Sequence, residues 1–278
     1  MKALTINIHS HFDKMDRISF EQNINTIAEY ITRHPLDVIA IQECSQTLDE
    51  KEIEGTSLGS FVSYEDGVTI KADNYAYLIV QALSDLGQNY NWTWTGAKIG
   101  YDRFDEGLAI LTRHEILDQE TAYISKSTDY SNWKVRKVVG ICIEIDGEKN
   151  WFYSTHMGWW KDEEERFVDQ MNKLQVLISN KEANVFLMGD FNSQSDLRGE
   201  GYDYVKSLGW HDTYERAGKK DAGITVPGTI DGWTDVSQGM RIDYIFSKNP
   251  VDVKKSEVIF NGKKKSVISD HFGVLVTL

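Results

Sequence analysis

Side chains that could carry out chemistry recur along this chain in seven short segments, nearly all of them beside an apolar run. These segments are Asn7 in TINIH, Glu43 in IQE, Glu106 in EGLAIL, His156 in STHM, Asp190 and Asn192 in GDFN, Arg241 and Asp243 in RIDYIF, and Asp270 with His271 in SDH. Polar groups at the ends of apolar strands meet at one rim of a sheet. Together these residues predict a metal-assisted hydrolase that acts on a phosphate ester.

Glu43 is a candidate ligand for a divalent cation. A phosphate ester resists hydrolysis because its oxygens repel an anionic nucleophile, and a cation screens that charge and stabilises the leaving alkoxide. Mg²⁺ prefers oxygen ligands and keeps several waters, so one or two carboxylates suffice to hold it. Glu43 follows the apolar run 38–42, so its carboxylate faces either solvent or a metal.

The segment GDFN follows another apolar run, 185–188. Residues two apart on an extended chain point to the same side, so Asp190 and Asn192 should share one face while Phe191 enters the core. Gly189 lets the backbone turn close to a ligand. The pattern predicts two polar side chains aimed at a common target.

Two histidines are candidates for proton transfer, because an imidazole titrates near neutral pH. His271 would act as general base, with Asp243 orienting its other nitrogen. The alternative for the pair Asp270–His271 is an ordinary surface pair. His156 could bind a phosphoryl oxygen or protonate the leaving group, and Glu106 could hold His156 as Asp243 holds His271.

These residues need a scaffold that brings distant strand ends together. Apolar, β-rich runs predict strands at 3–8, 38–42, 108–111, 138–145, 151–155, 185–188, 242–247, 258–260 and 274–278. Helical spacing predicts helices over 24–31, 72–86 and 162–178. The first has a capping box at Ser19 and Gln22 and a stop before Pro35, and the third has the acids 162–165 at its start. Asn261–Gly262 predicts a hairpin. Helices mixed with many strands favour mixed sheets with helices outside.

Composition favours one domain over residues 1–278, with 41% hydrophobic residues available for a core. The net charge of −13 argues weakly against a polyanionic substrate. The two cysteines, Cys44 and Cys142, are expected to be buried thiols. No apolar run is long enough to cross a bilayer, and MKALTINIHS lacks a secretory hydrophobic region. We therefore expect a cytoplasmic protein.

Six motifs taken in order resemble the endonuclease/exonuclease/phosphatase superfamily, which has the DNase I-like fold. They are Asn7, IQE at 41–43, STH at 154–156, GDFN at 189–192, RIDY at 241–244 and SDH at 269–271. Each is weak alone, but six in order along nearly the whole chain are specific. The resemblance implies an α/β fold, a four-layer α/β/β/α sandwich of two packed mixed sheets with helices outside, and a site on one rim between the sheets.

The resemblance also implies roles for the acids and amides. Glu43 would ligate Mg²⁺, with Mn²⁺ as a substitute. Asn7 would lie close to that metal, and so would Asp270. Asp190 and Asn192 would position water and a phosphoryl oxygen.

Further implied roles concern the histidines and one arginine. His271 would be the general base oriented by Asp243. His156, supported by Glu106, would contact or protonate the phosphate. Arg136 matches a phosphate-contacting arginine in some members of the superfamily.

His9 is a departure from the nuclease pattern. Some nuclease members carry an acid two residues after the first asparagine, whereas this chain has His9 there. The number of metal ions, one or two, therefore stays open. Because His9 lies two residues after Asn7, it shares the same face of the strand and is a candidate substrate contact.

Tryptophans suggest a substrate that contains a sugar. Trp159, Trp160 and Trp233 could stack on sugar rings; the alternatives are packing under a loop or a membrane-dipping hairpin. The segment 50–105 is long for a link between adjacent strands and could shape a substrate pocket, although an ordinary outer helix would explain part of it. The chain is similar to maltose 6'-phosphate phosphatases, which implies a phosphomonoesterase acting on a small sugar phosphate.

Alternatives of two other kinds remain. The first is a nuclease or sphingomyelinase-type phosphodiesterase of the same fold, and the second is an inactive binding module. The basic runs at 254–255 and 263–265 read as a solvated hairpin tip rather than a nucleic-acid surface. We expect a small phosphorylated substrate, and no nucleic acid, membrane or protein partner.

Overall fold

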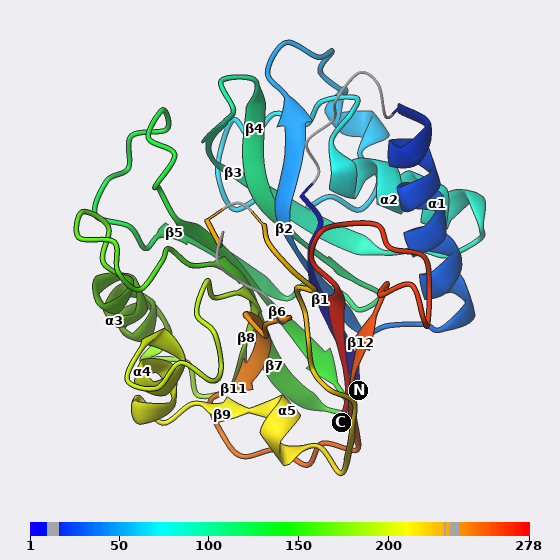
Figure 1. The fold of residues 1–278 in the computed structure, drawn as a ribbon. Coiled ribbons are helices and arrows are strands. Elements are labelled where there is room, and N and C mark those ends of the chain that lie inside the picture. The colour runs from blue at the N-terminus through cyan, green and yellow to red at the C-terminus, as the bar shows by residue number, and fades with distance from the viewer. Residues whose placement is uncertain (10–16, 231, 234–238) are drawn as a thin grey trace.

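Two mixed β-sheets pack face to face, and helices cover their outer faces (Figure 1). This computed structural model describes residues 1–9, 17–230, 232–233 and 239–278, except for the side chains of Arg17 and Ile18. The layer order confirms the α/β/β/α sandwich expected from the sequence. The two termini lie side by side at one end of the molecule, where Leu278 N donates to Met1 O.

In the described part of the chain the first sheet has seven strands, in the order β10-β12-β13-β1-β2-β4-β3. Strands β1 and β2 run parallel, while β13 and β4 flank them in antiparallel orientation. The strands are β1 Lys2–Asn7, β2 Val38–Thr47, β3 Asn91–Gly100, β4 Phe104–Thr112, β10 Lys219–Lys220, β12 Lys255–Ile259 and β13 Gly273–Thr277.

The second sheet has six strands among the described residues, in the order β5-β6-β7-β8-β11-β9. Its centre mirrors that of the first sheet, because β7 and β8 run parallel and β6 and β11 flank them in antiparallel orientation. The strands are β5 Asp118–Tyr123, β6 Lys137–Ile145, β7 Glu148–His156, β8 Asn184–Asp190, β9 His211–Asp212 and β11 Asp243–Ser247.

Three apolar layers hold the sandwich together. The middle layer joins the two sheets through side chains such as Ala40, Ile110, Ile141, Phe152 and Met188. One outer layer packs α1 and α2 on the first sheet, and the other packs α3 and α4 on the second. The helices are α1 Arg17–Arg33, α2 Tyr75–Asp85, α3 Phe167–Ile178, α4 Gly201–Ser207 and α5 Thr213–Arg216, with a 3-10 turn at Gly55–Ser57. No helix in the described ranges is long and apolar enough to span a bilayer.

Three local expectations were wrong. The helix α1 begins at Arg17, so Ser19 lies inside it and is no capping residue. The strand β2 continues past Glu43 to Thr47 instead of ending there. The helix α3 begins at Phe167, so the acids Asp162–Glu165 precede it. The hairpin predicted at Asn261–Gly262 is confirmed, because β12 and β13 are antiparallel neighbours, and the loop 260–272 that joins them is longer than a two-residue turn.

Asp37 joins strands β1, β2 and β4 at the rim of the first sheet opposite the motifs. Its carboxylate accepts hydrogen bonds from the Lys2 amide and from Arg113 Nη2, both at 2.6 Å. It also lies 2.9 Å from His114 Nε2. Burial alone would raise the pKa of Asp37, but the bonds to His114, Lys2 and Arg113 outweigh it and lower the pKa below its ordinary value of 3.8. Folding therefore favours the ionised carboxylate.

The lowered pKa of Asp37 predicts that the stability of the protein depends on pH. A lowered folded-state pKa contributes stability that is present above pH 3.8 and is lost as the pH falls through the folded pKa. We expect Asp37→Asn to be less stable than the unchanged protein at about pH 6, with a gap that narrows toward about pH 3. Urea denaturation of both proteins across this range measures the gap. A gap that stays constant over the range would contradict the assignment.

Candidate active site

The motif residues meet at one rim of the sandwich because the central strands of both sheets end there. Asn7 ends β1, His156 ends β7 and Asp190 ends β8. The register places His156 opposite Asp190 and Asp190 opposite Asp243, the first residue of β11. Asp270 and His271 come just before β13. Side chains from both sheets thus line one cavity of about 450 Å³.

Backbone irregularities aim three of these side chains into the site. The pairing of β2 with β4 shifts register between Ile41 and Cys44, and Glu43 within this bulge has φ 47°. His9 and Asn192 also adopt left-handed conformations, with φ 40° and 44°. Non-glycine residues in this region store strain of the kind that gathers at functional sites.

Asn7 joins carboxylates from the two sheets. Its Nδ2 donates to Glu43 Oε1 at 2.8 Å and to Asp190 Oδ2 at 3.2 Å. Its Oδ1 accepts from the backbone amide of His9 at 3.1 Å, and His9 Nδ1 lies 3.1 Å from Glu43 Oε2 and 4.0 Å from Asp270 Oδ2. The predicted metal residues Glu43, Asn7 and Asp270 therefore surround one end of the cavity, together with His9.

His271 and Asp243 form the closest imidazole–carboxylate pair in this site. The Nδ1 of His271 lies 2.9 Å from Asp243 Oδ2, and its Nε2 lies 3.8 Å from Asp190 Oδ2. Ser269 Oγ accepts from the His271 amide and donates to Asn7 O, which fixes the SDH segment against β1. His271 is buried and pairs with Asp243, whereas Asp270 is partly exposed, so the surface-pair alternative for Asp270–His271 does not describe His271.

Electrostatics around His271 favour its charged form. Burial lowers the pKa of His271, but Asp243, Asp190 and Asp270 outweigh it and raise the pKa to about 10. Asp190 is buried as well, and burial together with Asp243 and Glu43 raises its pKa to about 7 against the opposing charge of His271. A cation bound at these carboxylates would lower both pKa values.

His156 is held by an amide instead of the predicted carboxylate. Its Nε2 lies 3.2 Å from Asn192 Nδ2 and 3.6 Å from Asp190 Oδ2. Burial, followed by the charge of Arg136, lowers the pKa of His156 well below its ordinary value, so the ring is neutral. Glu106, which the sequence predicted as the support of His156, pairs with Lys98 at 3.1 Å, and the described residues show no hydrogen bond between Glu106 and His156.

Arg136 is a buried guanidinium without a carboxylate partner among the described residues. Its side chain lines the cavity, and the residue is only 3% exposed. Within the described ranges the Nε has no hydrogen-bond partner, and Nη1 makes a long 3.5 Å contact with the carbonyl of Val135. The guanidinium lies 5.5 Å from the ring of Trp159. Burial lowers the pKa of Arg136, because a buried charge without a close partner is unfavourable.

Lys98 is a functional candidate that the sequence analysis missed. It lines the cavity, and its Nζ donates to Trp133 O at 2.9 Å in addition to pairing with Glu106. The register of β3 against β4 shifts between Gly96 and Lys98. This irregularity turns Lys98 away from the face of Trp92 and Trp94, which pack in the outer core, so simple alternation could not find it.

The predicted substrate tryptophans separate in the structure. Trp159 lines the cavity and packs closely on Gly232. Trp160 packs instead on Phe167 and Tyr204 in the helical layer and is not among the residues that line the cavity. Trp233 sits beside the site, where its Nε1 donates to Asn192 Oδ1 at 3.2 Å and so fixes that amide.

Segment 50–105 contributes to several parts of the fold. It contains α2, which packs on α1, and the edge strand β3. Its last residues reach the site, where Lys98, Gly100 and Tyr101 line the cavity.

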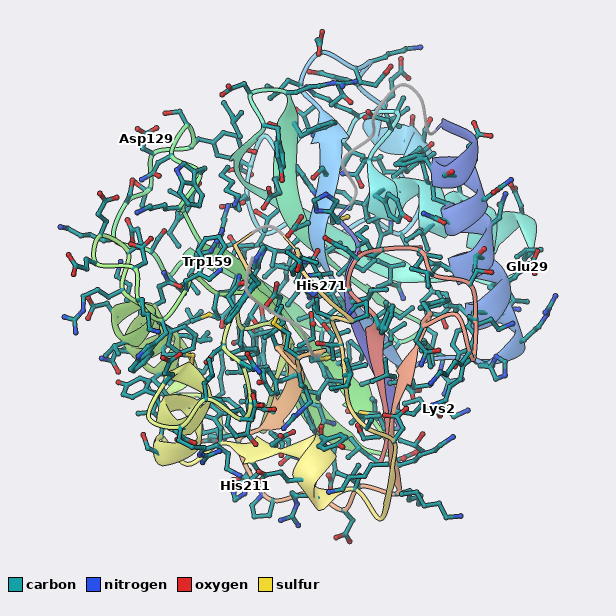
Figure 2. All side chains as sticks on the ribbon, viewed as in Figure 1. Lys2, Glu29, Asp129, Trp159, His211 and His271 are labelled. Atoms are coloured by element: carbon teal, nitrogen blue, oxygen red, sulfur yellow. The ribbon has the colours of Figure 1, made fainter. Side chains whose placement is uncertain are left out.

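Figure 2 shows Trp159 and His271 near the centre of the molecule and His211 at its lower edge, far from both.

The donor set fits a divalent cation. The described residues that line the cavity include four carboxylates (Glu43, Glu106, Asp190 and Asp270) but only two basic side chains, Lys98 and Arg136. Ligating atoms of Asp190, Asp243 and His271 lie within 4.8 Å of one another. Glu43 and Asp190 also share a single amide nitrogen, which brings two like charges together. Oxygen-rich, negatively charged sites of this kind suit hard divalent cations.

Comparisons with known proteins show the family of the chain. Residues 4–271 match the Endonuclease/Exonuclease/phosphatase family. A family protein from Leptotrichia buccalis C-1013-b is 33% identical, with a TM-score of 0.86 over 100% of this chain and 98% of that one. A search of curated proteins found no match.

Two less similar structures share the fold. The mannosyl-6-phosphatase of Bacteroides thetaiotaomicron VPI-5482 is 20% identical, with a TM-score of 0.69 over 100% of this chain and 98% of that chain. A humanized D. rerio TDP2 is 17% identical, with a TM-score of 0.60 over 99% of this chain and 97% of that chain. With its family match and its 33% identical relative, the chain belongs to the endonuclease/exonuclease/phosphatase family.

Proposed function

We propose that the protein is a divalent-cation-dependent phosphomonoesterase that acts on a small sugar phosphate. The family consists of hydrolases that act on phosphoesters. The main support for the proposal is the buried guanidinium of Arg136. This residue is 3% exposed, lines the cavity and has no carboxylate partner among the described residues. A dianionic phosphate monoester would supply the missing charge, because planar guanidinium groups bind phosphate oxygens with two parallel hydrogen bonds.

The cation, Mg²⁺ or Mn²⁺, would be held by Glu43, Asp190 and Asp270, with Asn7 beside them. When bound, it would screen the phosphoryl oxygens and stabilise the leaving alkoxide. The choice of a hard cation follows from the oxygen-rich donors. The close approach of the Glu43 and Asp190 carboxylates at the Asn7 amide supports this choice of ligands.

The remaining side chains divide the other tasks. His271 directs Nε2 toward the carboxylate end of the cavity while Asp243 holds its Nδ1, the arrangement of an oriented proton-transfer group. Neutral His156 and the Asn192 amide face each other at 3.2 Å and would contact phosphoryl oxygens. Arg136 would bind the opposite side of the phosphate.

The dimensions of the cavity support a small substrate. About 450 Å³ lies in the range of pockets that enclose small ligands. The net charge of −13 disfavours long polyanions. One protein with this fold is a mannosyl-6-phosphatase, which makes a sugar phosphate the first substrate to test. All candidate catalytic side chains are present and converge, which argues against an inactive binding module.

Phosphate release from a panel of esters tests the proposal. The panel comprises sugar phosphates, nucleoside monophosphates, sphingomyelin and plasmid DNA, each with Mg²⁺. We expect the highest kcat/KM for a sugar phosphate. Plasmid nicking or sphingomyelin cleavage at a higher kcat/KM would replace the proposed phosphomonoesterase with a phosphodiesterase of the same fold.

Chelation tests the dependence on a divalent cation. We expect EDTA to abolish phosphate release and added Mg²⁺ or Mn²⁺ to restore it, since the excess carboxylates would otherwise repel the substrate. The stability of the protein provides a second readout, because a ligand that binds only the folded state raises Tm. Mg²⁺ should therefore raise Tm, and Glu43→Gln should reduce that rise. Full activity in EDTA would contradict the proposal.

A further inference from the structure

Trp133 is an exposed tryptophan that lines the same cavity as the catalytic candidates. It is 54% exposed, whereas Arg136 and His156 at the inner part of the cavity are 3% and 9% exposed. Single exposed aromatic residues are common on protein surfaces and need no function. Trp133 differs from them because it stands at the more exposed end of a concave, charged site.

The chain around Trp133 is pinned on several sides. Its carbonyl accepts from buried Lys98 Nζ at 2.9 Å. The next residue, Lys134, forms salt bridges of 2.9 Å with Asp162 and with Glu164. Three residues earlier, the Tyr130 carbonyl accepts from the Ile99 amide at 2.7 Å. The backbone that carries the ring is therefore fixed before any ligand arrives.

Trp133 and Trp159 together form a corner of aromatic surface. Their ring centroids are 5.8 Å apart and their planes are inclined by 60°. Trp159 is itself held between the Arg136 guanidinium, at 5.5 Å, and the backbone of Gly232. A path therefore leads from the phosphate-binding guanidinium, along Trp159, to the exposed face of Trp133.

We propose that Trp133 is a specificity-determining residue that binds the second ring of a disaccharide phosphate. This inference rests on the proposed sugar-phosphate activity and names the substrate class more narrowly. With the phosphate at Arg136, the phosphorylated ring lies beside Trp159 and the next ring reaches Trp133. Tryptophan faces present apolar surface to the C–H face of a sugar ring, and their rigidity limits the entropic cost of binding.

Kinetics with two matched substrates test this subsite. Maltose 6'-phosphate and glucose 6-phosphate carry the same phosphorylated ring, and only the first has a second ring. We expect Trp133→Ala to lower kcat/KM for maltose 6'-phosphate about five- to tenfold, mostly through KM, and to leave glucose 6-phosphate within about twofold. Trp133→Phe keeps an aromatic ring and should recover most of the loss.

A matched control is Tyr64→Ala. Tyr64 is 65% exposed but does not line the cavity, so its replacement should leave kcat/KM unchanged for both substrates. Equal losses on both sugar phosphates in Trp133→Ala, or no loss on either, would overturn the subsite. If Trp133→Ala loses as much kcat/KM for adenosine monophosphate as for maltose 6'-phosphate, the ring binds nucleobases, which would also overturn the sugar subsite.

Failure of the proposed function gives a different result. In that case the unchanged protein hydrolyses neither sugar phosphate. Saturation-transfer NMR with unphosphorylated maltose then judges the subsite without turnover. Maltose signals that weaken in Trp133→Ala but not in Tyr64→Ala support the subsite, and signals that are absent or equal in all three proteins overturn it.

Discussion

Replacement of His271 by alanine should lower kcat for phosphate release by at least about 10²-fold, the usual scale of proton-transfer catalysis. The Nε2 of His271 faces the carboxylates of the cavity, and Nδ1 is 2.9 Å from Asp243. The other two described imidazoles of the cavity differ: His156 is bonded to an amide, and His9, whose Nδ1 lies 3.1 Å from Glu43 Oε2, is far more exposed than His271. KM should change much less than kcat, which steady-state kinetics on a sugar phosphate can show.

The matched variant is Asp243→Asn, which keeps the size of the side chain and removes its charge. It should also lower kcat, because the imidazole loses both its orientation and its stabilised charge. Thermal denaturation must accompany both variants, since His271→Ala leaves a buried carboxylate unpaired. A folded His271→Ala protein with near-wild-type kcat would end the assignment of His271 to proton transfer.

Replacement of Arg136 by methionine should raise KM for a sugar phosphate at least about tenfold and leave Tm unchanged or higher. The guanidinium is buried without a described carboxylate partner, so its burial costs stability that only a bound anion offsets. Methionine fills similar space without a charge. Loss of substrate binding together with retained or increased stability is the signature of a residue kept for function.

Arg241→Met is the matched control for this prediction. Arg241 is also mostly buried, but it pairs with Asp212 at 2.7 Å and lies against the rings of Tyr202, Tyr214 and Tyr244. Its removal should lower Tm, because it leaves Asp212 buried and unpaired. A fall in Tm for Arg136→Met as large as that for Arg241→Met, with KM unchanged, would make Arg136 a structural residue.

Sequence patterns predicted the central strands and the main helices because these elements have strong, regular periodicity. The apolar runs at 38–42, 138–145 and 185–188 all lie in central strands, where both faces are buried. Short edge elements, such as β5, β9 and β10, carry no such pattern and were missed. Their formation depends on the neighbouring strand rather than on their own residues.

The sequence could also indicate which residues meet, but not all of their pairings. Motif order gave Asn7, Asp190 and His271, each of which ends or shortly precedes a strand at the same rim, and Glu43, which lies in the bulge of β2. The Glu106–Lys98 pair depends on a shift of register that no local pattern reveals. Trp160 shows the same limit, because a neighbour of a cavity residue can face the opposite layer.

A crystal structure of the protein with Mg²⁺ and orthovanadate would reveal whether the motif residues form one phosphoryl site, because this anion imitates a phosphoryl group. We expect the anion to lie within hydrogen-bonding distance of Arg136 and His156, with the cation between it and Glu43. An anion bound away from Arg136, or a cation far from Glu43 and Asp190, would contradict the claim that these side chains form one phosphoryl site.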